Sequence, residues 1–406
     1  MAEILTLAQS EAENNQNKLG HILLYTDCPG IYGASQWNHS LIMKLVDLGY
    51  DVSCAQCQAS HHLIEQRNQR GIQHFWLNDD NLYLPSTPAR AFSNTSEFQT
   101  IFALAKPDLI VFSDGCPVSN IVAKKVAIQM EIPYIILIHA VTHSWVKKFV
   151  AYLHYLPDIY QQARGIFTVS QENLDLLHQK FKLPENLGRV IYNGRPAQYF
   201  NPPNLEVRDR LRQQFSIPHD AVVCFTAARM DISKGYQYQI KAIEQLKQRK
   251  IWSQLYFIWA GTGNLSIQLQ TVAAELGISD RIKFVGERAD IPDLLDAADI
   301  FILPSQFEGM PLAIMEAMAK GKPAIASAVS GIPEQLGNTG KLLSDPKLDP
   351  EATIRELAIA IETLAADAEL RYSIGQAGKI RAEKMFREER MLEEYVVIIK
   401  RALIIN

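Results

Sequence analysis

Short apolar runs alternate along the chain with longer stretches whose apolar residues recur at helical spacing. In the first half, stretches such as 35–48 and 118–129 lie between these runs and predict helices. This alternation is typical of βαβ units that build a mostly parallel sheet. The expected strands of the first half are residues 21–25, 51–54, 72–76, 109–112, 134–138, 166–169 and 189–192.

The pattern is interrupted between residues 193 and 204, where Pro and Asn are frequent, and such a composition is typical of a linker. Alternation then resumes, and the chain ends in three helical segments, 351–366, 368–385 and 387–405. We therefore expect an α/β protein of two doubly wound, Rossmann-like domains, 1–197 and 198–385, with an interdomain cleft. The expected strands of the second half are 221–226, 255–260, 282–285, 300–303 and 324–326.

Composition narrows the class of protein. The 406 residues are 48% hydrophobic and 21% charged, with a formal net charge of −4. We count 15 basic and 17 acidic residues up to residue 197, which leaves 25 basic and 27 acidic residues after it. Neither half has the basic excess of a nucleic-acid-binding protein, so we expect no nucleic-acid partner.

Localisation and metal content follow from the same composition. The first 19 residues contain no apolar core of signal-peptide length, and no run approaches the length of a membrane span. The five cysteines favour reduced thiols, so we expect a cytoplasmic protein. Cys54 and Cys57 precede His61 and His62 at a spacing that suggests zinc, but no second Cys pair completes a structural site, so we expect no metal.

Two glutamates bracket the most informative stretch of the chain, Glu308 to Glu316. The stretch follows an apolar strand and opens a helix, with Pro311 at or near its first position. Glu316 should lie about five residues into this helix, or roughly 7.5 Å along its axis. Two ionised carboxylates at that spacing suit the vicinal hydroxyls of a sugar or a ribose.

Two cations follow the first strand of the second half. Arg229 should stand at the end of this strand and Lys234 at the start of the next helix. Two cations converging on a helix N-terminus could hold a diphosphate without a metal ion. The alternative is an ordinary surface arginine followed by a lysine at a helix start.

Two glycine-containing turns could bring the backbone close to a ligand. Gly261 and Gly263 follow the next strand, but Ser266 takes the place of the third glycine of a dinucleotide fingerprint, which disfavours a nicotinamide dehydrogenase. Gly33 follows the first strand of the chain and could likewise admit a phosphate, or simply form a tight turn. His139 ends an apolar strand and is either a buried histidine or a residue lining the cleft.

These motifs together resemble the family 4 glycosyltransferases, retaining enzymes of the GT-B fold. The resemblance is strongest from Arg229 to Leu343, and it includes the sequences around Gly261, Glu308 and Glu316. Further matching pieces are Phe284-Val285-Gly286, Gly321-Lys322-Pro323, Ser330-Gly331-Ile332-Pro333-Glu334 and Gly340-Lys341-Leu342-Leu343. The first half matches in outline only, through Thr168-Val169-Ser170, Val190-Ile191-Tyr192-Asn193-Gly194 and the glycine loop.

The resemblance implies a role for each matching position. Arg229 and Lys234 would hold the donor diphosphate, Glu308 would contact hydroxyls of the donor sugar, and Glu316 would take the ribose hydroxyls. The remaining donor-binding positions would be Gly33 beneath the diphosphate, His139 facing the sugar, Gly261 and Gly263 in the strand–helix turn, Glu287 and Arg288 beside the base, and backbone N–H groups between Gly309, Met310, Pro311 and Leu312.

The chain departs from the family pattern at two places. Tyr32-Gly33 followed by Ala34 replaces the usual double or triple glycine, and Arg195-Pro196 replaces the usual Val-Asp after Asn-Gly. The first departure concerns the diphosphate contact at Gly33, and the second concerns the contact of the linker.

The resemblance also implies a reaction. A sugar would pass from a nucleotide sugar, such as a UDP- or GDP-sugar, to an unidentified acceptor with retention at the anomeric carbon and no cofactor. The acceptor could be a polysaccharide intermediate, a lipid-linked glycan or a small molecule. The alternatives are another GT-B enzyme, such as a nucleotide-sugar epimerase or a phosphorylase, and a non-catalytic nucleotide-sugar-binding protein.

Two further segments bear on partners. Residues 143–160 mix aromatic and basic side chains, so they could contact the inner face of an anionic membrane or pack their aromatic face into their own domain. The resemblance implies that the last helix, 386–406, crosses back to the N-terminal domain, and that a hinge near residue 197 allows closure over the donor.

Overall fold

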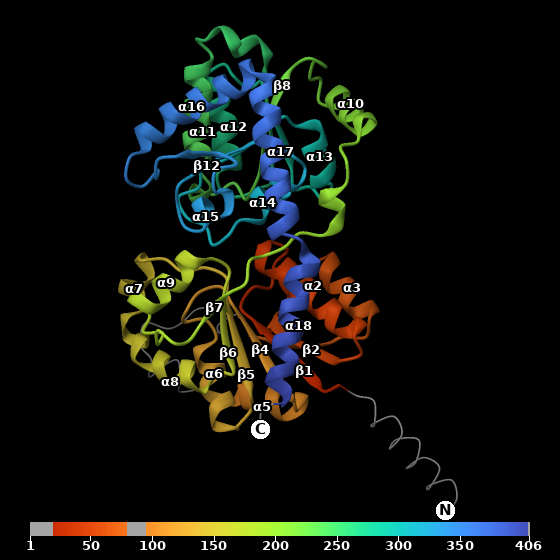
Figure 1. The fold of residues 1–406 in the computed structure, drawn as a ribbon, viewed down its shortest axis with the longest axis vertical. Coiled ribbons are helices and arrows are strands. Elements are labelled where there is room, and N and C mark those ends of the chain that lie inside the picture. Colours follow the sequence, from red (N-terminus) through yellow and green to blue (C-terminus); the bar gives the residue numbers. More distant parts are fainter. Residues whose placement is uncertain (1–18, 79–94, 405–406) are drawn as a thin grey trace, which may run out of the picture. The chain divides into compact units, whose positions relative to one another are not determined.

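The computed structural model describes residues 19–78 and 95–404, and they form two compact α/β units (Figure 1). The first unit comprises Met1–Ile191 together with Met391–Asn406, and the second comprises Tyr192–Arg390. Each unit is built on its own parallel sheet.

The first sheet has seven strands in the order β3-β2-β1-β4-β5-β6-β7. Its neighbouring strands pair in parallel, for example Leu24 of β1 opposite Cys54 of β2 and Val111 of β4. Apolar residues fill both faces of the central strands because helices cover both sides. The strands are β1 (His21–Thr26), β2 (Asp51–Cys57), β3 (Gln73–Leu77), β4 (Leu109–Asp114), β5 (Tyr134–Ile138), β6 (Gly165–Thr168) and β7 (Arg189–Val190).

Helices follow most of these strands. The helices of this part of the chain are α2 (Gly33–Asp47), α3 (His62–Gln69), α5 (Ser96–Ala105), α6 (Ile121–Gln129), α7 (Ser144–Lys148), the 3-10 helix η2 (Val150–Tyr155), α8 (Leu156–Gln162) and α9 (Gln171–Lys180). Ser170 is the N-cap of helix α9, and its side chain accepts a hydrogen bond from the Asn173 N–H.

The second sheet has six strands in the order β10-β9-β8-β11-β12-β13. Apart from β13, its strands lie where the apolar runs predict them. The exception has three residues at the edge of the sheet, with Leu342 exposed, so it has no continuous apolar run that could mark it in the sequence. The strands are β8 (Val222–Ala227), β9 (Leu255–Ala260), β10 (Ile282–Gly286), β11 (Ile300–Leu303), β12 (Ala324–Ser327) and β13 (Lys341–Leu343).

The predicted terminal helices are present as three consecutive elements, α16, α17 and α18. The helices of this part are η3 (Ala197–Phe200), α10 (Leu205–Gln214), η4 (Ile232–Lys234), α11 (Tyr236–Leu246), η5 (Lys250–Gln254), α12 (Ser266–Glu275), α13 (Ile291–Ala297), α14 (Leu312–Ala319), α15 (Ile332–Leu336), α16 (Pro350–Ala366), α17 (Ala368–Met385) and α18 (Glu388–Ile404). The η elements are 3-10 turns.

Helix α18 packs on the first unit from Met391 onward (Figure 1). The Tyr395 ring contacts Trp37 of α2 at 4.9 Å and Phe167 of β6 at 6.0 Å between ring centroids. The Arg164 guanidinium also donates to the carbonyl oxygen of Ala402. The last helix of the chain therefore packs into the core of the first unit.

Both sheets change direction at one pair of neighbouring strands. Strand order reverses between β1 and β4 in the first sheet and between β8 and β11 in the second. Ligands of doubly wound sheets bind at the carboxyl ends of strands near such a point. The loops after β8 and β11 carry Lys234 and Glu308, so the candidate functional site lies at the second switch point.

The segment from 143 to 160 packs its aromatic face inward. Tyr152, Leu156 and Tyr160 are buried in the core of the first unit, and Trp145 and Phe149 pack against that core, while Lys147 and Lys148 are exposed. Across residues 19–78 and 95–404, none of the helices combines the length and the apolar composition that crossing a membrane requires.

Candidate functional site

A partly buried ion pair joins the two loops at the second switch point. The Lys234 Nζ donates to Glu308 Oε1 at 2.6 Å, and the side chains are 19% and 9% exposed. The Ser305 hydroxyl donates to the same oxygen at 2.7 Å. Two donors on Oε1 fix the carboxylate and leave Oε2 to accept from another group.

Lys234 lies in a 3-10 turn before helix α11, whereas the sequence places it at the start of that helix. Gly235 separates the two elements with φ +77°, and a Cβ there would lie 1.9 Å from the carbonyl oxygen of Pro304. The Gln306 N–H also donates to the Ser233 carbonyl at 2.7 Å. The glycine lets the two loops touch through their backbones, and this contact sets the position of Lys234.

Arg229 is the more exposed cation of the site. Its Nη2 lies 3.3 Å from Asp231 Oδ2, and its side chain is 52% exposed. Asp231 in turn accepts from the Ser233 N–H and so begins the 3-10 turn that carries Lys234. The two cations therefore stand on one short loop, linked through Asp231.

Gly261 and Gly263 bring the turn after β9 against that same loop. A Cβ on Gly261, whose φ is +129°, would lie 2.0 Å from the Ala228 carbonyl oxygen. A Cβ on Gly263 would lie 2.4 Å from the Met230 carbonyl oxygen. The close approach that these glycines allow is to the backbone before Lys234, so their first role is to pack two loops together.

The backbone after Glu308 is held through its carbonyl groups. Gly309, Met310 and Pro311 accept from the Gly331 N–H, the Asn193 side-chain amide and the Gln335 side-chain amide. Among residues 19–78 and 95–404, the N–H groups of Gly309, Met310 and Leu312 donate to no other group. Pro311 is the N-cap of α14, so these N–H groups cluster at a helix start, where the dipole favours an anion.

Glu316, five residues into α14, lies against the linker residue Arg195. The Arg195 Nη2 is 2.8 Å from Glu316 Oε1, with the side chains 7% and 9% exposed. The Arg195 guanidinium lies over the Tyr199 ring, 4.7 Å from its centroid. Sequence reasoning marked Arg195 only as a departure from the family pattern and did not predict this buried pair, because its partner is 121 residues away along the chain (316 − 195).

Arg288 makes a two-pronged ion pair with Asp290 through distances of 2.7 and 2.5 Å. Hydrogen bonding with this partner raises the pKa of Arg288 and lowers the pKa of Asp290. Neighbouring Glu287 is exposed. This pair fixes the loop after β10. The family resemblance implies that the base of the donor nucleotide lies beside this loop.

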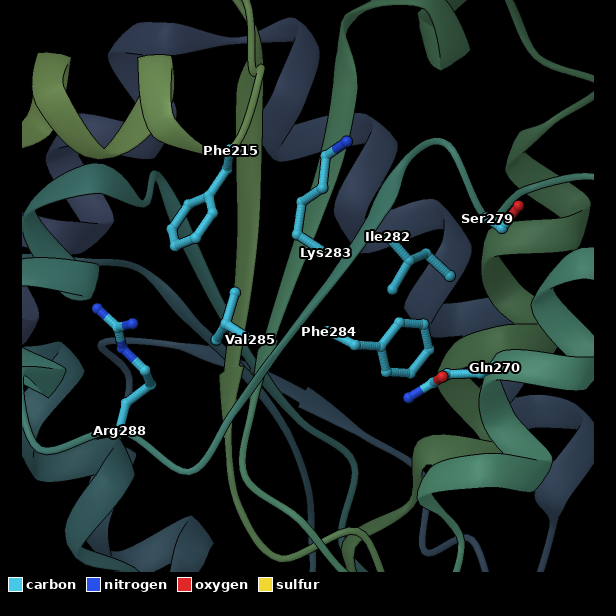
Figure 2. A pocket seen from close by; sticks show the side chains of 8 residues that line it. All are labelled: Phe215, Gln270, Ser279, Ile282, Lys283, Phe284, Val285 and Arg288. Atoms are coloured by element: carbon cyan, nitrogen blue, oxygen red, sulfur yellow. The ribbon is translucent and has the colours of Figure 1, made fainter.

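A cavity of about 530 Å³ runs along edge strand β10 (Figure 2). Its lining alternates between Phe284 and Gln270 on one side of the strand and Val285 and Phe215 on the other. Of the predicted site residues, Arg288 borders this cavity. The cavity therefore adjoins the predicted base loop rather than the Lys234–Glu308 pair.

Gly33 and His139 belong to the first unit. Gly33 is the first residue of helix α2. His139 directly follows β5, and its Nε2 lies 2.9 Å from the Ser113 hydroxyl. Burial lowers the pKa of His139 from 6.5 to about 3, so this imidazole is neutral at physiological pH.

Polar residues that the sequence analysis did not single out lie around Asp114, which neighbours His139. The backbone N–H of His139 donates to the carbonyl oxygen of Asp114, whose buried carboxylate is paired with Lys124. Asp27, after β1, accepts from the Gly115 N–H and the Ser119 hydroxyl. Desolvation raises the pKa of Asp114 to about 7. These carboxylates lie at the carboxyl ends of β1 and β4, the two strands at the first switch point. Their place at the ends of predicted strands is the signal by which the sequence could have indicated them.

In residues 19–78 and 95–404, no group of three or more His, Cys, Asp or Glu is arranged to hold a metal ion. Cys54 and Cys57 are buried in β2, and burial raises the pKa of Cys54 to about 11. They are packing residues of the sheet.

The fold and the polar strand ends define the class of protein. Two α/β units with parallel sheets constitute the GT-B fold. A crystal structure of Anabaena Alr3699/HepE in complex with UDP matches with a TM-score of 0.78 at 21% identity, over 94% of this chain and 100% of that one. At this identity the likeness concerns the fold alone.

The sequence places the chain within that class. The family described as Glycosyl transferases group 1 matches residues 207–381, and Glycosyltransferase Family 4 matches residues 31–199. Together these matches take in most of the chain, which belongs to the family 4 glycosyltransferases.

Curated relatives agree with that assignment. The amylovoran biosynthesis glycosyltransferase AmsK of Erwinia amylovora is 32% identical over 230 residues, which are 52% of this chain and 53% of AmsK. The D-inositol 3-phosphate glycosyltransferase of Corynebacterium efficiens is 32% identical over 218 residues, 51% of this chain and 49% of that protein. The match thus spans about half the length of these relatives.

Proposed function

We propose that the protein transfers a sugar from a nucleoside diphosphate sugar to an acceptor hydroxyl, with retention at the anomeric carbon and without a metal ion. The observation that carries the proposal is the partly buried Lys234–Glu308 pair beside the N–H groups that begin helix α14. A cation, a carboxylate with one oxygen left to accept, and backbone donors form a complementary set for a sugar joined to a phosphate.

The cations act on the leaving group. When the bond between the anomeric carbon and the diphosphate breaks, negative charge grows on the departing oxygens. Lys234 and Arg229 would stabilise this charge, and the N–H groups of Gly309 and Met310 would add to the effect. These groups are held by the surrounding loops before the reaction, so little reorganisation opposes the step.

The carboxylates act as clamps on hydroxyl groups. Glu308 Oε2 would accept from hydroxyls of the donor sugar, and Glu316 would accept from the ribose hydroxyls. The acceptor oxygen would bond to the anomeric carbon on the face from which the diphosphate departs, and its proton would pass to the leaving phosphate. No protein nucleophile is needed, and the product keeps the configuration of the donor.

The named relatives support the class of donor. The solved structures of HepE contain UDP or UDP-glucose, and the curated relatives are named as glycosyltransferases. We infer a UDP- or GDP-sugar donor and a glycan, lipid-linked or small-molecule acceptor. The roles of Gly33 and His139 in donor binding stay predictions from the family resemblance.

The test is a screen of UDP-, GDP- and ADP-sugars for release of nucleoside diphosphate with and without candidate acceptors. We expect one donor to stabilise the protein against heat and to release its diphosphate faster when acceptor is present. Proton NMR of the product should show the anomeric configuration of the donor, and EDTA should leave the rate unchanged. Inversion, or loss of activity in EDTA, would contradict the mechanism.

The screen also separates the rivals. An epimerase would release diphosphate or a new nucleotide sugar without any acceptor, and a binding protein would be stabilised without turnover. A pyridoxal-dependent phosphorylase would show the absorbance of bound pyridoxal and would need a lysine for the cofactor. Finding either pattern would replace the transferase assignment.

A further inference from the structure

Arg195 is fixed in place by the backbone on both sides. Its N–H donates to the Phe386 carbonyl at 2.8 Å, and its own carbonyl accepts from the Glu388 N–H at 3.0 Å. The preceding Gly194 admits this second segment, because a Cβ there would lie 2.6 Å from the Arg387 carbonyl oxygen. The side chain of Arg195 therefore starts from a rigid position.

The side chain ends in a buried polar cluster. Its Nη2 pairs with Glu316 Oε1, and its guanidinium stacks on the Tyr199 ring. Burial and the nearby Glu316 carboxylate raise the pKa of the Tyr199 hydroxyl, so this hydroxyl is protonated. The cluster consists of one cation, one carboxylate and one neutral hydroxyl.

The guanidinium of Arg195 is incompletely paired. Within residues 19–78 and 95–404, its Nε is buried and has no hydrogen-bond partner. Nε and Nη2 share one edge of the planar group, so the unpaired N–H points to the same side as the Glu316 carboxylate. A buried N–H without an acceptor lowers the stability of the folded protein, and most buried N–H groups in proteins have an acceptor.

A second buried arginine in the same unit shows what a structural role looks like. Arg212 donates from Nε to the Ala297 carbonyl, from Nη1 to the His219 and Ala221 carbonyls, and from Nη2 to Asp299. All three nitrogens of Arg212 are paired, as expected for an arginine that only joins elements. Arg195 differs because, of the two nitrogens on the edge that faces Glu316, Nη2 is paired and Nε is not.

We propose that Arg195 is a specificity-determining residue of the nucleotide subsite, which holds Glu316 for the ribose hydroxyls and donates its Nε–H to an oxygen of the same ribose. The inference rests on the proposed function, since that function supplies the nucleotide. An ionised carboxylate has about four acceptor positions, so the pairing with Arg195 leaves room for both vicinal hydroxyls. A ribose lacking one hydroxyl would leave part of this buried polar set unpaired and should be rejected.

The experiment measures affinity by calorimetry for the nucleoside diphosphate that binds best among UDP, GDP and ADP, and for its 2′-deoxy counterpart. The wild-type protein should bind the ribonucleotide about tenfold more tightly or better. In Arg195→Met we expect the ribonucleotide to bind about tenfold more weakly while the deoxynucleotide changes little, so that the preference is lost. Arg195→Lys should lie between the two because it keeps the charge but not the planar fork.

The matched control is Arg212→Met, which removes an equally buried arginine and its carboxylate contact. It should lower the melting temperature and keep the wild-type preference for ribose. If Arg195→Met fails to fold, Arg195→Lys and the double variant Arg195→Met with Glu316→Gln decide the matter, the latter because it leaves no lone buried carboxylate. In the double variant we expect the preference for ribose to be lost, because both proposed contacts to the ribose hydroxyls are removed.

Two failures are distinguishable. If the wild-type protein binds no nucleoside diphosphate, the proposed function and this inference fall together. If it binds one and the preference for ribose persists unchanged in Arg195→Met or Arg195→Lys, Arg195 is a structural residue and only the inference falls.

Discussion

Lys234 and Glu308 form a 2.6 Å ion pair between loops that are 74 residues apart in the chain. The loops follow β8 and β11, which are hydrogen-bonded neighbours in the second sheet. This adjacency converts two distant motifs into one site at the point where strand order reverses.

Lys234→Ala should reduce turnover by about 100-fold or more, because it removes a preorganised cation from the leaving group. It also leaves Glu308 buried with Ser305 as its remaining side-chain donor, so we expect a loss of about 1–3 kcal/mol in unfolding free energy. Initial rates of diphosphate release and thermal melting measure the two effects.

The control for that variant is Lys241→Ala, an exposed lysine of helix α11. It should keep both rate and stability. Turnover of Lys234→Ala within about threefold of the wild type would remove Lys234 from the mechanism.

Arg229→Ala should separate function from stability. Because the Arg229 side chain is 52% exposed, its loss should change the unfolding free energy by no more than about 0.5 kcal/mol. We expect kcat/KM for the donor to fall about tenfold or more, from the loss of a charged hydrogen bond to the diphosphate. A large fall in melting temperature with normal kcat/KM would show that Arg229 only holds Asp231.

Gly261→Ala and Gly286→Ala form a matched pair of glycine substitutions. Both residues have positive φ, but a Cβ on Gly261 would strike the Ala228 carbonyl, whereas Gly286 has nothing within 4 Å of its added Cβ. We expect Gly286→Ala to cost about 1–2 kcal/mol from backbone strain alone. Gly261→Ala should cost more and should weaken donor binding, as measured by urea unfolding and by calorimetry. Equal effects of the two changes would contradict the loop contact.

His139→Gln should reduce the acid sensitivity of the protein. Burial lowers the pKa of His139 from 6.5 to about 3, so between these values the unfolded chain binds a proton that the folded chain does not. The buried neutral His139 therefore causes no loss of stability above pH 6.5. As the pH falls from 6.5 toward 3, it lowers the free energy of unfolding.

For the measurement, urea unfolding at pH 7 and pH 5 should show a smaller loss of stability in His139→Gln than in the wild type. The difference should be about 1–2 kcal/mol. A loss between the two pH values that is the same for both proteins would mean that His139 titrates normally in the folded chain.

Residues 143–160 should not anchor the protein to a membrane. The aromatic rings of this segment pack on the core, and the residues that it exposes include Lys147 and Lys148 together with Val150 and Asp158. We expect the wild-type protein to stay in the supernatant with vesicles rich in anionic lipid at physiological salt, since charge alone binds weakly. Co-sedimentation that is lost in the double variant Lys147→Glu, Lys148→Glu would reverse this prediction.

The strands were predictable because their apolar runs are buried whatever lies beside them. Residues 255–260 and 300–303 show this, and both correspond to observed strands residue for residue. β13 escaped prediction because an edge strand of three residues needs only partial burial. Lys234 was placed on a helix because spacing alone does not reveal the left-handed Gly235 that ends the 3-10 turn.

By itself, the sequence determined the class of fold, the order of the elements and the residues that follow the strand ends, because hydrophobic period and turn chemistry are local properties. Only the tertiary structure decided how those residues pair. Arg195 and Glu316 meet because the linker runs against helix α14, and Gly261 serves the loop before Lys234 because β9 lies beside β8. Such contacts depend on which segments the sheet brings together. The order of the strands in a sheet cannot be predicted from the pattern of any single segment, because it depends on how all the segments pack.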